Sequence, residues 1–215
     1  MNIQPLIDRW QTDEGKPYKR DLIDMDAYNA DPSNPGCMCA QGQVLHHAGW
    51  DVRRLHHVEQ EEADREVAKL LNISNAHAVL LRIVNDNADG APAVVLTDPG
   101  AVLGGQWSKV LDFWWHLDTM SSAAWEAAWT AAGEDAWVTA GAASRGVAGE
   151  VALEVALEAA GEAAWKVARE AAWEIQGAET MRRDGRPFYF LPTFGFASPD
   201  DIPARPANYG PSTGE

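Results

Sequence analysis

The sequence predicts a mostly α-helical protein, and three observations support this fold class. Between Ala123 and Ala178, 21 of the 56 residues are Ala, and Glu, Leu and Lys, which also favour helices, recur among the others. In the first half of the chain, apolar residues return at the spacing of one helix face. Residues that start or stop helices, such as Ser74 and Gly49, flank these apolar runs.

A repeat of four residues runs from Trp125 to Met181, with Trp, Gly, Leu or Arg at the repeated position and Ala usually before it. A helix turns about 100° per residue, so a four-residue period drifts by about 40° at each step. One long helix would therefore place Trp on every side. We predict two antiparallel helices near 122–140 and 149–183, which the glycines between 141 and 149 separate.

The ends of this hairpin carry the usual signals of helix termini. Ser121 or Ser122 can cap the first helix, and Glu126 lies in its first turn. The second helix should end within 182–187, where two Arg residues precede a Gly and a Pro.

The first half is expected to be a compact helical domain that begins with an amphipathic helix. The apolar residues of that helix occupy positions i, i+3, i+4 and i+7 from Ile3 to Trp10, and Gly15 follows. A short helix should lie within 21–30. A further helix over 38–48 should stop at Gly49.

Cap residues mark the later helices of this half. Asp51 should cap one helix and Ser74 the next, although the apolar run at 79–84 could also be a strand. A polar turn is expected at 85–90, and the pair Asp98–Pro99 resembles a cap followed by a first-turn proline. The positions expected to be buried are Val52, Leu55, Val58, Val67, Leu70 and Leu71 after Asp51, and Trp107, Val110, Leu111, Trp114 and Leu117 in a last helix from about Gly105.

The composition changes again after Gly185. The segment 188–196 is aromatic, and the prolines that follow exclude a helix, so it is either an arm laid on its own chain, which we favour, or a clasp for a partner. The sequence therefore divides into a mostly helical domain at 1–118, a tetrad-repeat helical region at 119–185 and a Pro/aromatic arm at 186–215.

Charge and composition exclude several classes of function. The net charge of −15 disfavours direct nucleic-acid binding, because phosphates need a basic surface, and it suits a basic protein partner. No apolar run is long enough to span a membrane, and the first residues do not resemble a signal peptide. Two Cys residues make no disulfide framework, which indicates a reducing, cytoplasmic setting. Motifs for phosphate loops, nucleophile elbows and zinc proteases are absent, so no cofactor is expected.

Cys and His residues provide the candidates for metal binding and covalent catalysis. Cys37 and Cys39 precede the pairs His46–His47 and His56–His57, but C-x-C lacks the second Cys pair typical of zinc sites, so we expect no metal. Cys37 follows Gly36 near a helix N-terminus, a position that stabilises thiolates. A Cys/His nucleophile, with the His oriented by Asn85 or Asp86, has no local signature, and we expect no catalytic residues.

Ten Trp residues in 215 are too many to share one core face. Adjacent Trp114 and Trp115 point about 100° apart on a helix, and the drifting repeat separates later rings in the same way. Some rings should therefore contact another part of the chain or a partner, as aromatic residues at binding hot spots do. We expect a surface for self-association or a protein partner, formed by Trp115, Trp129, Trp137, Phe194 and Phe196.

The chain also resembles known proteins in two places. Cys39-Ala40-Gln41-Gly42, Leu81-Arg82-Ile83-Val84-Asn85-Asp86 with Gly90, and Val110-Leu111-Asp112-Phe113 together resemble a small domain of unknown function in actinobacterial and actinobacteriophage proteins, over about residues 37–117. The Ala/Trp/Glu repeat is similar to Ala-rich helical proteins of the same phages and of bacteria, some of them labelled immunity proteins. Neither resemblance implies a catalytic residue.

These resemblances imply a phage accessory protein in the cytoplasm of an actinobacterial host. We expect a non-enzymatic, protein-binding function in host takeover, defence evasion or immunity. One alternative is a structural or decoration protein of the virion, for which an extended aromatic arm would be natural. The second alternative is an enzyme that uses Cys37.

Overall fold

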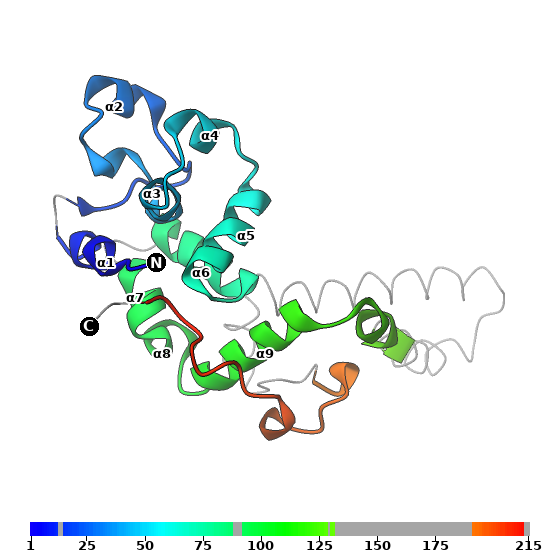
Figure 1. Ribbon diagram of the computed structural model, residues 1–215. Coiled ribbons are helices and arrows are strands. Elements are labelled where there is room, and N and C mark those ends of the chain that lie inside the picture. The colour runs from blue at the N-terminus through cyan, green and yellow to red at the C-terminus, as the bar shows by residue number, and fades with distance from the viewer. Residues whose placement is uncertain (13–14, 88–91, 129, 132–190, 213–215) are drawn as a thin grey trace, which may run out of the picture. The chain divides into compact units, whose positions relative to one another are not determined.

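The computed structural model describes residues 1–12, 15–87, 92–128, 130–131 and 191–212. The chain divides into two compact units: Met1–Trp115 with Ala204–Glu215 (unit 1), and His116–Pro203 (unit 2) (Figure 1). The described residues are mostly α-helical and contain no β-strand beyond two isolated bridges, which confirms the predicted fold class. The boundaries that the sequence suggests, after 118 and 185, stay a prediction, and residue 185 lies outside the described residues.

The chain begins with α1 (Gln4–Trp10), which buries Leu6, Ile7 and Trp10 at the predicted spacing and ends at Trp10. The short helix expected within 21–30 is α2 (Met25–Ala30). Asp24 starts it, because its carboxylate accepts hydrogen bonds from the backbone N–H groups of Asp26 and Ala27.

A single 3₁₀ turn, η2 (Pro35–Cys37), leads into α3 (Ala40–His47). The Cys39 sulfur caps α3 by accepting a hydrogen bond from the Gly42 backbone N–H at 3.3 Å. At Gly42 the helix lies so close to a neighbouring segment that a Cβ atom would come within 2.0 Å of the Leu22 carbonyl oxygen. Glycine is therefore required at this position for α3 to pack against residues 22–23.

One prediction in this region is wrong: the helix expected after Asp51 is two helices, α4 (Val52–His57) and α5 (Gln60–Leu71). Asp51 caps α4 as predicted, since its carboxylate accepts from the Arg54 N–H at 2.9 Å. Extended backbone at Val58 and Glu59 then breaks the helix. Of the positions expected to be buried, Leu55, Val67 and Leu71 are buried, whereas Val52, Val58 and Leu70 are only half-buried.

The apolar run at 79–84 lies in a helix, α6 (Asn75–Asn87), and not in a strand. Ser74 caps it as predicted, because its hydroxyl accepts from the His77 N–H at 3.0 Å. The helix extends through Asn87, so the turn expected from residue 85 cannot begin there, and 88–91 lie outside the described residues. In the described part of the chain no single helix is long and apolar enough to cross a membrane, and α5 and α6, bent by 111°, reach that length only when taken together.

Three helices follow: α7 (Pro92–Thr97), α8 (Pro99–Leu103) and α9 (Trp107–Thr119). The sequence analysis did not predict α7. Pro99 occupies the start of α8 as predicted, although the Asp98 side chain makes no capping hydrogen bond. In α9 the predicted core positions are buried apart from Trp107, which is half-buried; the buried ones are Val110, Leu111, Trp114 and Leu117.

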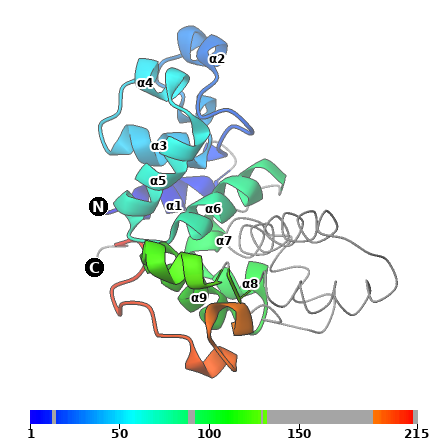
Figure 2. The same cartoon turned by 90° about the vertical axis from the view of Figure 1, so that its right-hand side faces the viewer.

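The core of unit 1 lies between helices that are close in sequence. α5 packs on α6, α6 on α7, and α3 on both α5 and α6. Figure 2 shows α3, α5, α6 and α7 stacked in this order. The largest side chains with less than 2% exposure in this unit are Trp10, Trp114, Phe113, Ile3, Ile7, Leu45, Leu55, Leu71, Leu80, Leu81 and Leu111.

Unit 2 is described at its two ends. A helix over 122–128 and 130–131 begins where predicted, and the Ser121 hydroxyl caps it by accepting from the Ala124 N–H at 3.2 Å. Two 3₁₀ turns, η3 (Leu191–Phe194) and η4 (Pro199–Asp201), follow near the other end. The rest of the predicted hairpin, with Trp129 and Trp137, lies outside the described residues.

Candidate functional site

Trp125 is the most exposed large aromatic residue of the described chain. Its side chain is 37% exposed, and among the described residues only Met1 is a comparably exposed large hydrophobic residue. The edge of one ring meets the face of another where Trp125 contacts Phe194, with centroids 6.0 Å apart and planes at 88°. This geometry holds the exposed indole in place, because edge-to-face pairs are favoured by the ring quadrupoles.

A second ring pair lies in the same unit. His116 and Phe196 meet edge to face, with centroids 4.9 Å apart and planes at 72°. Burial lowers the pKa of His116, which favours the neutral form of this imidazole. The Phe196 N–H donates to the Leu191 carbonyl oxygen at 3.1 Å, and the buried Leu191 side chain anchors the segment. We call His116, Trp125, Phe194 and Phe196 the aromatic group of unit 2.

The described residues of unit 2 carry carboxylates that no Lys or Arg of the same residues balances. Residues 116–131 and 191–203 contain four carboxylates, of which Glu126 is exposed and adjacent to Trp125, and no Lys or Arg. An indole face attracts cations, and carboxylates nearby strengthen that attraction. The arrangement therefore favours a ligand that is both cationic and partly apolar.

The residues predicted to form one interaction surface fall in different units. Phe194 and Phe196 belong to unit 2 and are half-buried by rings of their own chain. Trp115 belongs to unit 1, is half-buried, and meets the Tyr209 ring edge to face at 5.3 Å. Sequence analysis did not include Trp125 in the surface. The one sequence feature that distinguishes Trp125 is that it is the first Trp of the repeat and lies near the start of its helix.

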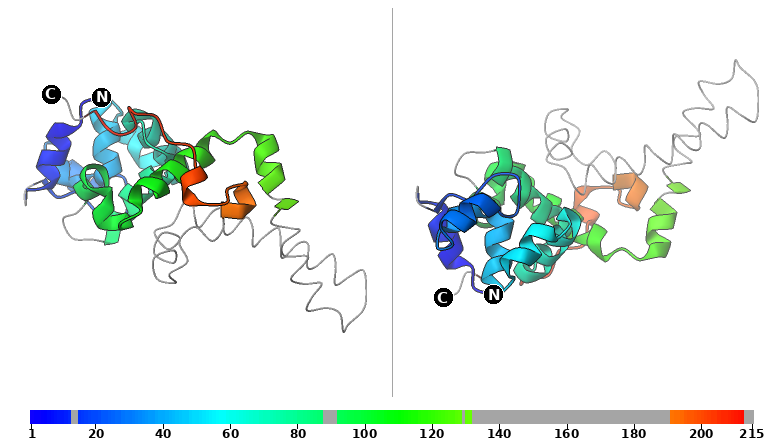
Figure 3. Two further views of the ribbon diagram at one scale, coloured as in Figure 1. Left: turned by 90° about the horizontal axis from the view of Figure 1, so that it is seen from below. Right: turned by 90° about the horizontal axis from the view of Figure 1, so that it is seen from above.

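A second arrangement of rings lies on unit 1, where residues 204–212, which we call the strap, cross α9 and approach the N-terminal residues (Figure 3). The Arg205 guanidinium forms an ion pair with Asp112 and donates to the Ser108 carbonyl oxygen at 2.8 Å. It also lies 5.6 Å from the Trp107 ring centroid and 5.1 Å from that of Tyr209. The strap thus brings its own cation to the rings that it covers.

Tyr209 anchors the other end of the strap through His77, which is 2% exposed. The His77 Nε2 atom lies 2.7 Å from the Val95 carbonyl oxygen, which can only accept, so Nε2 carries the proton. Nδ1 then accepts from the Tyr209 hydroxyl at 2.6 Å, and the two rings stack at 5.7 Å. Burial lowers the pKa of His77 to about 4, with a smaller contribution from the Arg205 charge.

Backbone contacts complete the attachment of the strap. Asn72, in the left-handed conformation that ends α5, donates its side-chain N–H to the Asn208 carbonyl oxygen at 2.7 Å. Its own carbonyl oxygen accepts from the Gly210 N–H at 3.0 Å. Ser212 pairs with Asn2 in an isolated parallel bridge. The strap is therefore part of the packing of unit 1.

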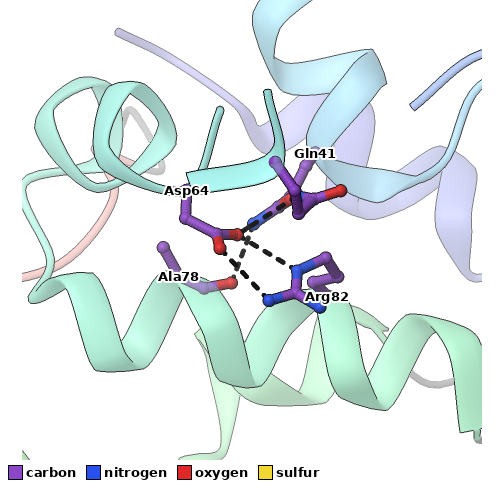
Figure 4. Close-up of polar contacts among 5 residues, drawn as sticks. Gln41, Asp64, Ala78 and Arg82 are labelled. Atoms are coloured by element: carbon purple, nitrogen blue, oxygen red, sulfur yellow. Dashed lines mark hydrogen bonds and ion pairs between the residues drawn. The ribbon is translucent and has the colours of Figure 1, made fainter. Parts of the chain in front are cut away.

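A buried polar network joins α3, α5 and α6 inside unit 1 (Figure 4). Asp64, 4% exposed, accepts from the Arg82 guanidinium at 3.1 and 3.2 Å and from the Gln41 amide at 2.7 Å. The same amide donates to the Ala78 carbonyl oxygen at 3.0 Å, while Gln60 donates to the Gln41 oxygen at 2.9 Å. The buried donors and acceptors of these side chains are paired with each other, so the network fixes how the three helices pack together.

The two thiols occupy positions that disfavour nucleophilic chemistry. We expected the Cys37 thiolate to be stabilised at a helix N-terminus, but burial and the charges of Asp24 and Asp31 raise its pKa. Burial raises the pKa of Cys39 to about 12.

The other candidates for covalent catalysis and metal binding have structural partners. The Asn85 side chain accepts from the Ala40 N–H and donates to the Tyr18 carbonyl oxygen, and Asp86 accepts from the Arg20 N–H. A ring nitrogen of His46 contacts the Trp50 carbonyl oxygen, and one of His47 contacts that of Asn2. Across the described ranges, no three His, Cys, Asp or Glu side chains come together in a way that could hold a metal ion.

Comparison with known proteins adds nothing to this geometry. No protein-family model matches the chain, and no curated protein or solved structure is significantly similar to it.

Proposed function

We propose that this chain is a non-enzymatic, protein-binding protein that engages its partner through the aromatic group of unit 2. The observation that carries the proposal is the exposed Trp125 ring, which contacts Phe194 in a unit whose described residues include carboxylates and no Lys or Arg. Trp is strongly enriched among the residues that dominate binding energy at protein interfaces.

The chemistry of the group points to a basic protein segment as the partner. A Lys or Arg side chain placed over the Trp125 face would gain a cation–π interaction of about 0.5–2 kcal/mol, depending on how far it is desolvated. Glu126 and the other carboxylates of the unit would steer such a segment toward the ring, an effect that salt weakens. Apolar side chains beside the cation would contact Phe194 and Phe196.

The two thiols support a binding function over catalysis. Cys37 and Cys39 are buried with raised pKa values, so both remain protonated thiols near neutral pH. A Cys-dependent enzyme would need an accessible thiolate beside a base, and Asn85 and Asp86 hold backbone groups of residues 18, 20 and 40.

The biological role that we attach to this binding is that of a phage accessory protein, acting in host takeover, defence evasion or immunity in a bacterial cytoplasm. It rests on the resemblance of residues 37–117 to actinobacteriophage proteins and on the Ala/Trp/Glu repeat. A basic host protein, or a basic component of a defence system, would have the chemistry that the aromatic group selects.

Binding of a defined basic probe tests the proposal. The probe is a fluorescent peptide of alternating Arg and Leu, and its control is the same peptide with Glu in place of Arg. We expect the Arg peptide to bind the full chain and Trp125→Ala to weaken binding about tenfold, the equivalent of about 1.4 kcal/mol. Trp50→Ala is the matched control, because the Arg54 guanidinium already covers the Trp50 ring at 3.2 Å. Equal affinity of Trp125→Ala and the unaltered chain, or equal binding of both peptides, would contradict the proposal.

A further inference from the structure

The strap packs on residues from three helices of unit 1, and we call this set of residues the groove. The groove side contributes Asn72 at the end of α5, His77 from α6, and Ser108, Asp112 and Trp115 from α9. Two strap side chains, Arg205 and Tyr209, make the charged and aromatic contacts. Hydrogen bonds of 2.7–3.4 Å to backbone groups of the strap add to these contacts, and the side-chain recognition centres on an Arg and a Tyr four residues apart.

The attachment of the strap to the rest of the chain is short. Ile202 is buried in unit 2 and Arg205 is anchored on unit 1, and only Pro203 and Ala204, both exposed, lie between them. Pro203 and Pro206 restrict the backbone on both sides of Ala204. A hinge this short, held between prolines, limits how the strap can fold back on its own chain, and short hinges of this kind are a known setting for segment exchange.

We propose that the groove of unit 1 also accepts the strap of a second copy, and that the chain self-associates by reciprocal exchange of residues 204–212. An exchanged strap makes the same contacts with Asp112, His77 and Trp115 as the original one, so no contact energy is lost. The remaining cost is the entropy of association, which falls in importance as concentration rises. This association uses unit 1 and is independent of the basic partner proposed for unit 2.

The chemistry of the groove favours a second copy as the occupant. Asp112 requires a cation and His77 Nδ1 requires a hydroxyl donor, and the strap supplies both at the right spacing. In the sequence, no other Arg lies four positions before or after a Tyr. Another copy of the chain therefore carries the segment that the groove already recognises, in the same proline-bounded context.

Complementation between two full-length variants tests the exchange. Arg205→Ala with Tyr209→Ala disables the strap and leaves the groove, whereas Asp112→Ala with Trp115→Ala disables the groove and leaves the strap. We expect each variant alone to sediment as a monomer and their equimolar mixture to form a heterodimer. We also expect the unaltered chain, refolded at increasing concentration, to yield an increasing dimer fraction. A mixture that stays monomeric, together with an unaltered chain that refolds only to monomer, overturns the proposal.

Replacement variants, a unit 2 variant and a free strap peptide keep the result interpretable. If circular dichroism shows that a double variant does not fold, Arg205→Gln with Tyr209→Phe, which removes both the cation and the hydroxyl, replaces the first pair, and Asp112→Asn with Trp115→Phe replaces the second. Trp125→Ala should dimerise as the unaltered chain does, which separates this association from the unit 2 surface. A synthetic peptide of residues 203–212 should dissociate the heterodimer. If the peptide binds the strap-disabled variant while no copy of the chain does, the second copy is the wrong occupant.

Discussion

Aromatic rings on unit 1 lie beside Arg side chains of their own unit, whereas the described residues of unit 2 include no Lys or Arg that could do the same. On unit 1, Arg205 lies near the Trp107 and Tyr209 rings, and Arg54 lies 3.2 Å from the Trp50 ring centroid. The described residues of unit 2, which include Trp125 and Phe194, hold four carboxylates and no Lys or Arg.

This difference distinguishes aromatic residues that complete a fold from those available for binding. Tyr209 has its hydroxyl bonded to His77 and its ring stacked on the same imidazole, so its requirements are met inside the chain. Trp125 has a ring partner but remains 37% exposed in acidic surroundings. The high Trp content of the sequence does not separate the rings that complete the fold from those available for binding. The presence or absence of a neighbouring Arg from the same unit does.

Truncating one Trp in each unit should show the largest contrast. Trp114 is 1% exposed, so Trp114→Ala should lower the free energy of unfolding by about 3–5 kcal/mol through lost burial and the cavity that remains. Trp125→Ala should cost about 1 kcal/mol or less, because its ring is exposed and near-surface substitutions are mild. Chemical denaturation followed by circular dichroism measures both. Similar losses for the two variants would remove the distinction between the rings.

Breaking the polar network tests how much the hydrogen bonds and the ion pair around Asp64 contribute to the stability of unit 1. Asp64→Ala leaves the Arg82 guanidinium and the Gln41 amide without their acceptor, and should cost about 3 kcal/mol, since Arg82 keeps some access to water. Arg54→Ala, which breaks an exposed ion pair with Glu62, should cost less than 1 kcal/mol. Equal denaturation midpoints for Asp64→Ala and the unaltered chain would mean that the network contributes no stability.

Acid should weaken unit 1 through His77. Unfolded His77 binds a proton near pH 6.5 and folded His77 only near pH 4, so between these values the unfolded state holds more protons. Stability therefore falls as the pH drops from about 6.5 to about 4, by about 3 kcal/mol from this residue. His77→Gln, which cannot titrate, should lose that much less over the same range in urea titrations. Parallel pH profiles for the two proteins would contradict this assignment.

The smallest effect is expected at the strap hydroxyl. Tyr209→Phe keeps the stacked ring but leaves the buried His77 Nδ1 without a donor, which should cost about 1–2 kcal/mol. Asn208→Ala is the control on the neighbouring residue, because the groove binds only the backbone carbonyl oxygen of Asn208, and its cost should stay within about 0.5 kcal/mol. Thermal melts at neutral pH can resolve the difference. If the two variants melt together, the hydroxyl does not anchor the strap.

Local signals in the sequence predicted most of the helix starts. Asp51, Ser74 and Ser121 each cap a helix as expected, because a cap depends on residues only two or three positions away. The break at Val58 and Glu59 was missed, since apolar spacing continues across it while the backbone becomes extended. Propensity carries no information on such a break when tertiary packing decides it.

The long-range contacts could not be predicted from the sequence. Asp64 and Arg82 lie 18 residues apart on separate helices, and Asn72 and Asn208 lie 136 residues apart. Each of these residues looks like an ordinary surface or turn residue in its local window. The sequence suggested that the aromatic arm lies on its own chain, but it gave no means of locating the groove or of separating Trp125 from the other Trp residues.

The strap also has a consequence for how the protein is made. The residues that it contacts at Asn72, His77 and Asp112 leave the ribosome long before Arg205 and Tyr209 are synthesised, because all of unit 2 is translated in between. Until then, the Asp112 carboxylate lacks Arg205, and the His77 ring lacks Tyr209 while it keeps its contact with the Val95 carbonyl oxygen. The nascent chain therefore passes through a stage in which unit 1 has its helices but an open groove, and in which a neighbouring copy on the same messenger RNA can offer its strap first.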